Sequence, residues 1–484
     1  MHIIHIASEL AIIAKVGGLG DVLYGLSKEL ARLGHHVQIL LPKYDCIDYT
    51  KLVNLRVFYR DLWSFEGPYR YHNTIWTAEL ENLSLLLLEP HHPQYFFSRG
   101  QIYGCPDDVE RFLYFSRAAM EFLFKSALSP DVIHLHDWPT ALIPLLQKEM
   151  YQALGLLPKK TVLTLHNLEH QGLCSPKHLS QIGLKGEHYL SKELLQDPSH
   201  AHLINILKGG ILYADHITTV SPAYEREIQT KEAGHGLHDI LKTHKLTGIL
   251  NGIDEDFWNP ETDAFLVHPY PAHPPFSAQT WATLLQGKQH NKEQLQKQLH
   301  LSLSKEPLVA CVTRLVPQKG PLLLAHAFRY VLEQGAQCVI LGSVFSEEMR
   351  ELFSFLQAEY RASKQGIILL ESNEALAHKI YAAADLFLVP SIFEPCGLSQ
   401  MIALRYGTIP LIRKTGGLGD TVFEGQNGFV FENPTKEALC TTLDRALTLY
   451  KEHPSLWQKL MKAGMTQDHS WRHAAQHYLK LYTS

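Results

Sequence analysis

The stretch Lys15-Val-Gly-Gly-Leu-Gly-Asp21 recurs near the other end of the chain as Lys414-Thr-Gly-Gly-Leu-Gly-Asp420, with six of seven positions identical. Each copy follows a short apolar run that predicts a β-strand. Glycines without a Cβ let backbone N–H groups approach a ligand closely, and the adjacent lysine is suited to a phosphate. The same pattern also fits a tight strand-to-helix turn with a solvated lysine. It is neither a dinucleotide fingerprint, because Leu23 stands where the third glycine would be, nor a Walker A loop.

Outward from these two turns, the chain alternates short apolar runs with stretches of helical spacing. Continuous apolarity, rather than alternation, indicates strands that are covered on both faces. We therefore expect an α/β fold with a mostly parallel, doubly wound sheet in each half. The predicted strands cover residues 3–7, 37–41, 52–58, 83–88, 132–135, 162–165 and 217–220, then 248–250, 309–312, 339–341, 367–370, 386–389, 409–412 and 429–431. The predicted helices include residues 21–33, 109–126, 322–334, 346–362 and 374–383.

The length of 484 residues favours two large domains, at a typical ~100–200 residues per domain. We expect one α/β domain over residues 1–245 and a second over residues 246–464, with a Pro-rich loop or connector at residues 267–275. Ligands of open α/β sheets bind beyond the carboxyl ends of the strands, so two such domains that face each other would form a binding cleft.

The composition excludes several classes of function. A net charge of −5 without a basic stripe argues against a nucleic-acid partner. Apolar runs far shorter than the ~20 residues that span a bilayer argue against a membrane protein. Seven cysteines without a Cys-x-x-Cys pair, and an N-terminus unlike a signal peptide, predict a cytoplasmic protein.

Polar motifs follow five of the predicted strands, where the sheet rule expects ligands. They are His136-Asp137-Trp138, His166-Asn167, Asn251-Gly252, Arg314 with Lys319, and Glu394-Pro395-Cys396-Gly397. Any one of them could be ordinary loop sequence, but five in one internally repeated chain favour a binding surface.

Arg314 and Lys319 form the sharpest pair among these motifs. Two cations beyond a strand end suit a diphosphate, with the arginine as a planar fork and the lysine as a point charge. Pro317 between them would stiffen the loop. The alternative is a solvated or ion-paired surface pair.

Two groups of residues have the chemistry of metal ligands. His134 and His136 share one face of a predicted strand next to Asp137, but no second cluster with metal spacing accompanies them. Asp254 and Asp256 could mimic a metal-binding Asp-x-Asp, yet they suit a turn better. We expect neither a metal nor a cofactor.

The ordered set of motifs carries a family resemblance. The N-terminal motifs are Lys15-Val-Gly-Gly-Leu-Gly-Asp21, His136-Asp-Trp-Pro-Thr-Ala-Leu142, Leu165-His-Asn-Leu168, Leu207-Lys-Gly-Gly-Ile211 and Leu250-Asn-Gly-Ile-Asp254. The C-terminal motifs are Thr313-Arg-Leu315 with Gln318-Lys-Gly320, Glu394-Pro-Cys-Gly-Leu-Ser-Gln400 and Lys414-Thr-Gly-Gly-Leu-Gly-Asp420. Together they resemble bacterial glycogen synthases and plant starch synthases, in the order of that family, from residue 15 to residue 422.

The resemblance implies the two-domain glycosyltransferase architecture called GT-B, whose last helix, at about residues 465–484 here, crosses back onto the N-terminal domain. The C-terminal domain would bind the nucleotide sugar. The reaction implied is metal-free transfer of glucose from a nucleotide-glucose donor to the non-reducing end of an α-1,4-glucan such as glycogen, with retention at the anomeric carbon. ADP-glucose is the favoured donor, and UDP-glucose stays open.

The resemblance also implies roles for individual residues. Catalytic roles fall on Arg314 and Lys319 at the leaving diphosphate, on Glu394 at the donor, and on His166 and Asp137 at the transferred glucose or acceptor. Substrate-binding roles fall on Lys15, Gly17, Gly18, Asp21, Asn251, Cys396, Gly397, Leu398, Thr415, Gly416 and Gly417, and on Tyr381 as the aromatic that stacks on the base.

Two alternatives remain at this point. One is another retaining GT-B glucosyltransferase, against which the doubled glycine-rich motif argues. The other is an inactive glucan-binding paralogue, which would have lost Lys15, Arg314, Lys319 or Glu394, whereas all four are present. Ile402 stands where related transferases often carry a second glutamate, an absence that the synthases share.

Overall fold

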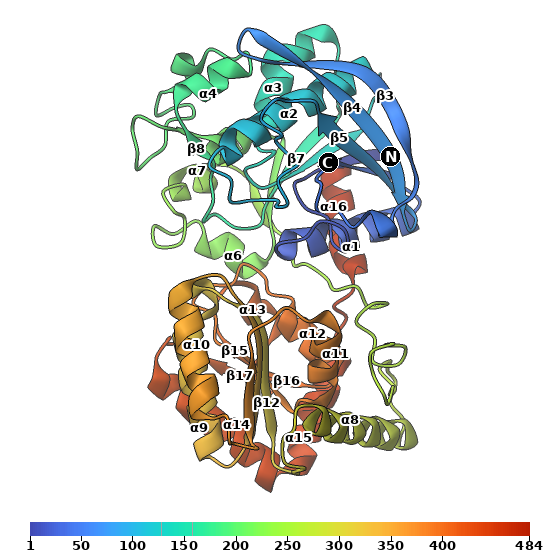
Figure 1. Ribbon diagram of the computed structural model, residues 1–484, viewed down its shortest axis with the longest axis vertical. Coiled ribbons are helices and arrows are strands. Elements are labelled where there is room, and N and C mark those ends of the chain that lie inside the picture. Colours follow the sequence, from blue (N-terminus) through green and yellow to red (C-terminus); the bar gives the residue numbers. More distant parts are fainter. Residues whose placement is uncertain (127, 157) are drawn as a thin grey trace. The chain divides into compact units, whose positions relative to one another are not determined.

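The computed structural model describes residues 1–126, 128–156 and 158–484. The chain forms two compact units, one of Met1–Gly252 with Trp471–Ser484 and the other of Ile253–Ser470. Each unit is built on its own sheet (Figure 1). The α/β prediction with two sheet-based halves is therefore confirmed.

The first unit contains a nine-stranded sheet in the order β11-β10-β7-β6-β1-β2-β5-β4-β3. Its strands are β1 (His2–Ile6), β2 (His36–Pro42), β3 (Val53–Glu66), β4 (Tyr69–Leu80), β5 (Leu83–Pro90), β6 (Val132–His136), β7 (Lys160–Leu165), β10 (His216–Thr219) and β11 (Leu246–Gly248), and a separate pair is β8 (Leu173–Cys174) with β9 (Ile204–Asn205). Its helices are α1 (Gly18–Arg32), α2 (Asp108–Lys125), α3 (Ile143–Leu146), α4 (Pro176–Gln181), α5 (Ile206–Tyr213), α6 (Pro222–Glu227), α7 (His238–Thr243) and α16 (Trp471–Thr483).

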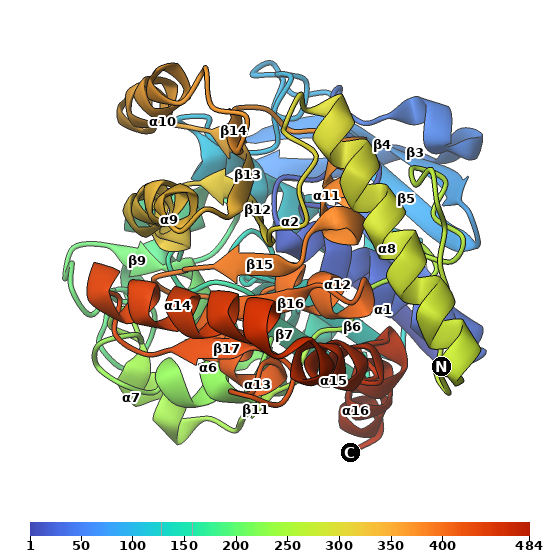
Figure 2. The same ribbon diagram turned by 90° about the horizontal axis from the view of Figure 1, so that it is seen from below.

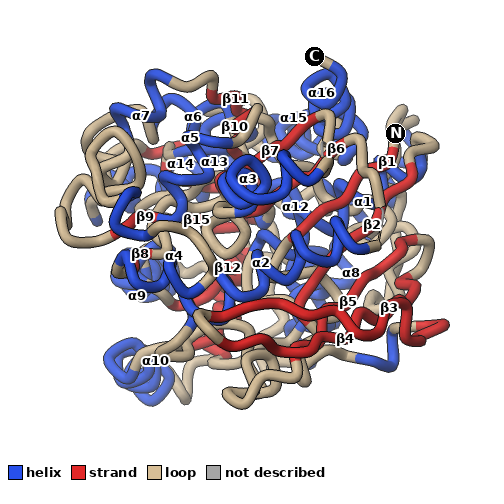
Figure 3. The backbone as a smooth tube through the Cα atoms, turned by 90° about the horizontal axis from the view of Figure 1, so that it is seen from above, coloured by secondary structure: helices blue, strands red, loops and turns tan. Residues whose placement is uncertain are grey.

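One edge of this sheet is antiparallel, which the sequence did not predict. β3 pairs antiparallel with β4, and β4 pairs antiparallel with β5 (Figure 3). The predicted strand at residues 52–58 is only the first half of β3, and β4 was missed altogether. Both strands mix polar and apolar residues because one face of this edge is exposed, so they lack the continuous apolarity of the buried parallel strands.

The second unit contains a six-stranded parallel sheet in the order β14-β13-β12-β15-β16-β17. Its strands are β12 (Leu308–Leu315), β13 (Gln337–Val344), β14 (Gly366–Leu369), β15 (Leu386–Val389), β16 (Ile409–Arg413) and β17 (Phe429–Phe431). Its helices are α8 (Ala278–Gln298), α9 (Pro321–Glu333), α10 (Glu347–Glu359), α11 (Glu374–Ala383), α12 (Ser399–Arg405), α13 (Gly416–Thr421), α14 (Lys436–Glu452) and α15 (Pro454–Met465).

Helices cover both faces of the second sheet, as a doubly wound fold requires. In Figure 1, α9 and α10 lie on one side of the strands, and α11 and α12 lie on the other, where α8 packs against α11. α14 packs along β17, as Figure 2 shows from below. The carboxyl ends of these parallel strands carry the polar motifs of the C-terminal half.

The boundary between the units differs from the predicted one. The strand expected at residues 248–250 of the second domain overlaps β11 only at Gly248, and β11 pairs with β10 of the first sheet. The units meet after Gly252 rather than near residue 245. The apolar run was recognised, but its sheet partner cannot be read from the run itself.

α16 returns the end of the chain to the first unit. It begins at Trp471 and not at the predicted residue 465, which belongs to α15. Trp471 and Tyr478 are buried in a core with Leu26 of α1. A Cβ on Gly25 would lie 1.9 Å from the Trp471 indole nitrogen, so this glycine lets α1 and α16 pack closely. Tyr482 donates to or accepts from His134 in β6 at 2.7 Å.

Within the described residues, no helix has both the length and the apolarity needed to cross a membrane.

Candidate active site

Lys319 and Glu394, which are 75 positions apart in sequence, form an ion pair in the second unit. Lys319 follows β12 and donates to the Glu394 carboxylate at 2.5 Å, and Ser391 donates to the same carboxylate oxygen at 3.0 Å. Glu394 is only 6% exposed, so its charge depends on these donors. The lysine ammonium carries three N–H donors, and one of them makes this bond to Glu394.

Arg314 is a cation of this unit without a side-chain partner in the part of the chain that the structure describes. It lies at the end of β12, where its guanidinium makes no hydrogen bond or ion pair with any described residue. Its partly exposed side chain therefore keeps five donors for a ligand, which is the geometry that binds phosphate oxygens bidentately.

The second glycine-rich stretch packs against the segment that carries Glu394. A Cβ on Gly416 would lie 2.0 Å from the Glu394 carbonyl oxygen, and one on Gly417 would lie 2.5 Å from the Cys396 Cα. The Gly417 N–H donates to the carbonyl of Glu394 at 3.2 Å. These glycines therefore serve the protein's own packing, and the predicted phosphate contact of Thr415, Gly416 and Gly417 stays a prediction.

The turn after Glu394 supplies backbone donors. Gly397 adopts a φ of +75°, which aims the chain into α12, and the amides of Gly397 and Leu398 donate to no described residue. Gln400 fixes the turn through its side-chain amide, which donates to the carbonyl of Gly397 at 2.9 Å. The turn thus offers two amides at a helix N-terminus, while the role predicted for Cys396 is untested.

In the first unit, the first glycine-rich stretch is held by a residue that the motif did not identify. The Glu9 carboxylate accepts the amides of Val16 and Gly17 at 2.6 and 2.7 Å, and the Tyr103 hydroxyl at 2.9 Å. The Gly17 amide, which was expected to face a ligand, is therefore already committed to Glu9. Ser8-Glu9 follows β1, so the strand-end rule applied to the first strand would have found it.

Gly18 is the part of this stretch that the packing of the described residues leaves open. A Cβ on Gly18 would meet nothing within 4 Å, so the packing of the protein does not itself require glycine there. Gly18 opens α1, whose N-terminus favours an anion. Lys15 lies beside it and is paired with Asp21 at 2.7 Å, in an exposed contact that a charged ligand can exchange.

Asp137 and His166 lie together at the ends of β6 and β7. Asp137 adopts a φ of +56°, and its carboxylate accepts the His166 amide at 2.6 Å. Desolvation raises the pKa of Asp137 to about 7, and the charge of nearby Glu9 adds to the rise. Asp137 thus orders the loop of His166, while direct contact with a sugar stays a prediction for both residues.

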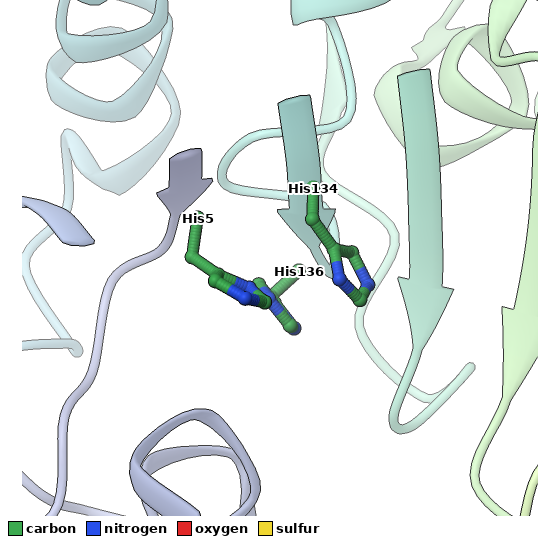
Figure 4. Close-up of side chains that lie close together, drawn as sticks. All are labelled: His5, His134 and His136. Atoms are coloured by element: carbon green, nitrogen blue, oxygen red, sulfur yellow. The ribbon is translucent and has the colours of Figure 1, made fainter. Parts of the chain in front are cut away.

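Three buried histidines lie behind His166. Within the described ranges, His5, His134 and His136 form the one group whose potential ligand atoms are close enough for a metal, all within 4.8 Å of one another (Figure 4). Both ring nitrogens of His134 are engaged, by Tyr482 and Thr164, and both of His136 are engaged, by His5 and His166. A metal would have to break these bonds, so the group fits a hydrogen-bonded cluster better than a metal centre.

The second group considered as metal ligands has a local role. Asp254 accepts the amides of Asp256 and Phe257 through one carboxylate oxygen, at 3.0 and 3.2 Å. This geometry closes a turn after Gly252.

Tyr381 does not have the position expected of it. Its side chain is 3% exposed and stacks on Phe387 of β15 at 4.8 Å, with Trp258 edge-on at 5.6 Å. The ring is buried because this face of α11 packs on the sheet, and its stacking on a base stays a prediction.

Asn251 is 5% exposed, and its side-chain oxygen has no partner among the described residues, which leaves an acceptor for a ligand.

Comparison with known protein families matches both units. The starch synthase catalytic domain model covers residues 2–243, and the group 1 glycosyltransferase model covers residues 292–460. A glycogen synthase of Protochlamydia amoebophila is 46% identical over 100% of this chain and 99% of its own length. The chain belongs to the glycogen and starch synthase family.

Other relatives agree. Glycogen synthase 2 of Methylococcus capsulatus is 42% identical over 99% of both chains. The catalytic domain of starch synthase IV from Arabidopsis thaliana, solved with ADP and acarbose, superposes with a TM-score of 0.94 at 45% identity and covers 100% of this chain and 98% of that one. The family resemblance and the GT-B fold predicted from the motifs are confirmed.

Proposed function

We propose that this protein is a glycogen synthase that transfers glucose from ADP-glucose to the non-reducing end of an α-1,4-glucan, with retention of the anomeric configuration. The observation that carries the proposal is the group at the carboxyl ends of β12 and β15. Arg314 is uncommitted there, and Lys319 is paired with the buried Glu394, in a chain that matches glycogen synthases over its full length. ADP is favoured because a relative at 45% identity was solved with ADP.

The proposed chemistry needs positive charge where the donor diphosphate departs. As the bond to the anomeric carbon breaks, the sugar gains oxocarbenium character and the diphosphate gains negative charge. Arg314 would hold phosphate oxygens through its fork, and Lys319 would use its two remaining N–H donors. Preorganised donors of this kind are worth about 3–4 kcal/mol each in other enzymes.

The other residues would handle the sugar. Glu394 and the free amides of Gly397 and Leu398 would bind hydroxyls of the donor glucose. His166 and Asn251 of the first unit would contact the transferred glucose or the acceptor, and Lys15 and Gly18 would contribute to donor binding. The acceptor hydroxyl would attack from the face that the diphosphate leaves and would pass its proton to the departing phosphate oxygen, which gives retention.

The alternative of an inactive glucan-binding paralogue has no observation in its favour, since each required side chain is present. Another retaining GT-B glucosyltransferase is also disfavoured, because glycogen synthases match the full chain at 42–46% identity. The cytoplasmic location stays a prediction.

The proposal is tested by transfer of label into glycogen from ADP-[¹⁴C]glucose and from UDP-[¹⁴C]glucose, each with and without a strong chelator. We expect incorporation mainly from ADP-glucose, at a rate that the chelator does not change. Incorporation only from UDP-glucose would correct the donor. Loss of activity in chelator, restored by magnesium, would require a metal in the reaction and would reopen Asp254 and Asp256 as ligands.

A further inference from the structure

Three imidazoles form one continuous hydrogen-bonded chain that ends at His166. His5 Nδ1 lies 3.1 Å from His136 Nε2, and His136 Nδ1 lies 3.0 Å from His166 Nε2. His5 and His136 have no exposed surface, while His166 keeps 8%. This series of hydrogen bonds therefore runs from His5 of β1, in the core, to His166 after the end of β7, where some surface is exposed.

All three rings are neutral. Burial lowers the pKa of His5 and of His166 to about 3 and that of His136 well below its ordinary value. A neutral imidazole carries one N–H and one bare nitrogen. His136 uses both of its nitrogens, so it must donate one bond and accept the other, and the two bonds must point in the same direction along the chain.

Only two directions are possible. If the bonds point inward, His166 Nε2–H donates to His136, His136 Nε2–H donates to His5, and His5 Nε2–H is left in the core. If they point outward, His5 donates to His136, His136 donates to His166 Nε2, and His166 Nδ1 carries the last N–H. The two directions differ in what they leave at each end of the chain.

The inner end decides between them. His5 Nε2 is fully buried and has no hydrogen-bond partner among the described residues. An orphaned buried N–H is rare and costly, whereas an acceptor without a partner is better tolerated. The inward direction would create such an N–H, and the outward direction leaves only a bare nitrogen.

We propose that His136, backed by His5, is a positioning residue that fixes the tautomer of His166, so that His166 Nδ1–H is held as a hydrogen-bond donor to an oxygen of the transferred glucose. No described residue partners this nitrogen, which is the outer end of the chain. The assignment of the sugar as the acceptor rests on the proposed function. The direction of the hydrogen bonds from His5 to His166 does not depend on the proposed function.

The direction is tested on the unmodified protein by ¹⁵N NMR of ring-labelled histidine, with the His166 signals identified by their loss in His166→Asn. We expect His166 Nδ1 to be protonated and Nε2 to be bare at pH 7.5. A protonated Nε2, in either the neutral or the cationic ring, would overturn the inference. This measurement needs no turnover, so it stands even if the proposed function fails.

The positioning role is tested by His136→Leu, with His134→Leu as the matched control. Both side chains are fully buried and their rings stack at 4.4 Å, but His134 bonds Tyr482 and Thr164 instead of His166. Rates are expressed per ADP-binding site by ADP titration, which corrects for misfolded protein. We expect kcat with ADP-glucose to fall at least ~10-fold further in His136→Leu than in the control, with KM for ADP-glucose changing less than kcat.

An equal loss of kcat in the two variants would show that the cluster only supports the fold. If neither the parent protein nor any variant transfers glucose, the proposed function fails, and the NMR result alone decides the direction of the chain.

Discussion

The Lys319–Glu394 ion pair is more deeply buried than the Lys15–Asp21 ion pair. The side chains of Lys319 and Glu394 keep 20% and 7% of their surface, whereas those of Lys15 and Asp21 keep 45% and 31%. Exposed pairs contribute about 0–1 kcal/mol, while an uncompensated buried charge is costly. Lys319 therefore neutralises Glu394 in the free protein, and in the proposed reaction it would also meet the diphosphate.

We predict that Lys319→Ala lowers kcat by about 10²–10³-fold, the loss seen when one strong transition-state donor is removed. The protein should still fold, with a lower melting temperature, because Ser391 still donates to the Glu394 carboxylate. Lys451→Ala is the control, since Lys451 makes an exposed pair with Glu306 at 3.0 Å. Wild-type turnover in the folded Lys319→Ala protein would rule out the diphosphate role.

The sequence points to candidate site residues most directly where they follow strands, and less directly where they lie on a helix. Arg314, Lys319 and Glu394 were found because the end of a parallel strand always lies at the ligand edge of its sheet. The burial of Tyr381 could not be predicted from the sequence, because it depends on which face of α11 packs on the sheet. Glu9 also lies just beyond a strand, β1, so the same rule applied to the first strand would have found it, whereas its bonds to the amides of Val16 and Gly17 leave no mark in the sequence.

The two glycine-rich turns show how one element can be used for two purposes. In both, the glycines lie at the start of a helix, α1 or α13. Gly417 is needed because its backbone touches Cys396, while nothing in the structure crowds Gly18. The glycines at matched positions of the two copies therefore serve different purposes, and the sequence repeat alone could not show this difference.

We predict opposite outcomes for the matched substitutions Gly18→Ala and Gly417→Ala. Gly417→Ala should lower the free energy of unfolding by about 1–3 kcal/mol, the usual cost of overpacking. Gly18→Ala should leave the melting temperature nearly unchanged but raise KM for ADP-glucose several-fold, because the new methyl group would occupy the space of the donor. Thermal unfolding and initial rates check both. Full activity of folded Gly18→Ala would remove the first turn from the donor site.

Most parallel strands were predicted because burial on both faces makes them continuously apolar, as in β12 and β16. α8 was not predicted, because Ala278–Gln298 is rich in glutamine and lysine and lacks a clear apolar stripe. One of those lysines, Lys288, is buried and donates to the carbonyls of Ala382 and Tyr406 and to the hydroxyl of Thr408.

For the whole molecule, the chain passes between the units twice, after Gly252 and again before Trp471. The first unit therefore completes its core only when the last helix has been made. The expected cleft between the domains concerns their relative placement and stays a prediction.

The buried histidines of the first unit also predict how stability depends on pH. Burial lowers the pKa values of His5, His134, His136 and His166, so the folded state resists protons that the unfolded state takes up. The stability that these groups contribute is fully present above pH ~6.5, and it falls with the pH by about 1.4 kcal/mol per pH unit for each histidine. Asp137, whose pKa is raised, acts in the opposite sense, but it is a single group.

We therefore predict that the free energy of unfolding falls steeply between pH 6.5 and pH 4.5, as measured by denaturant titration with far-UV circular dichroism. His134→Leu should be less stable at pH 7.5 but should show a shallower fall, by about one proton. A flat or rising stability below pH 6.5 would contradict the assignment of these rings as neutral.

Extension of an α-1,4-glucan with retention is the central property proposed for this protein. The most direct test is ¹H NMR of the enzyme with ADP-glucose and a maltooligosaccharide, in the presence of chelator. We predict growth of the α-1,4 anomeric proton signal in step with ADP release. Formation of a β-linkage, or hydrolysis of ADP-glucose without chain growth, would contradict the account.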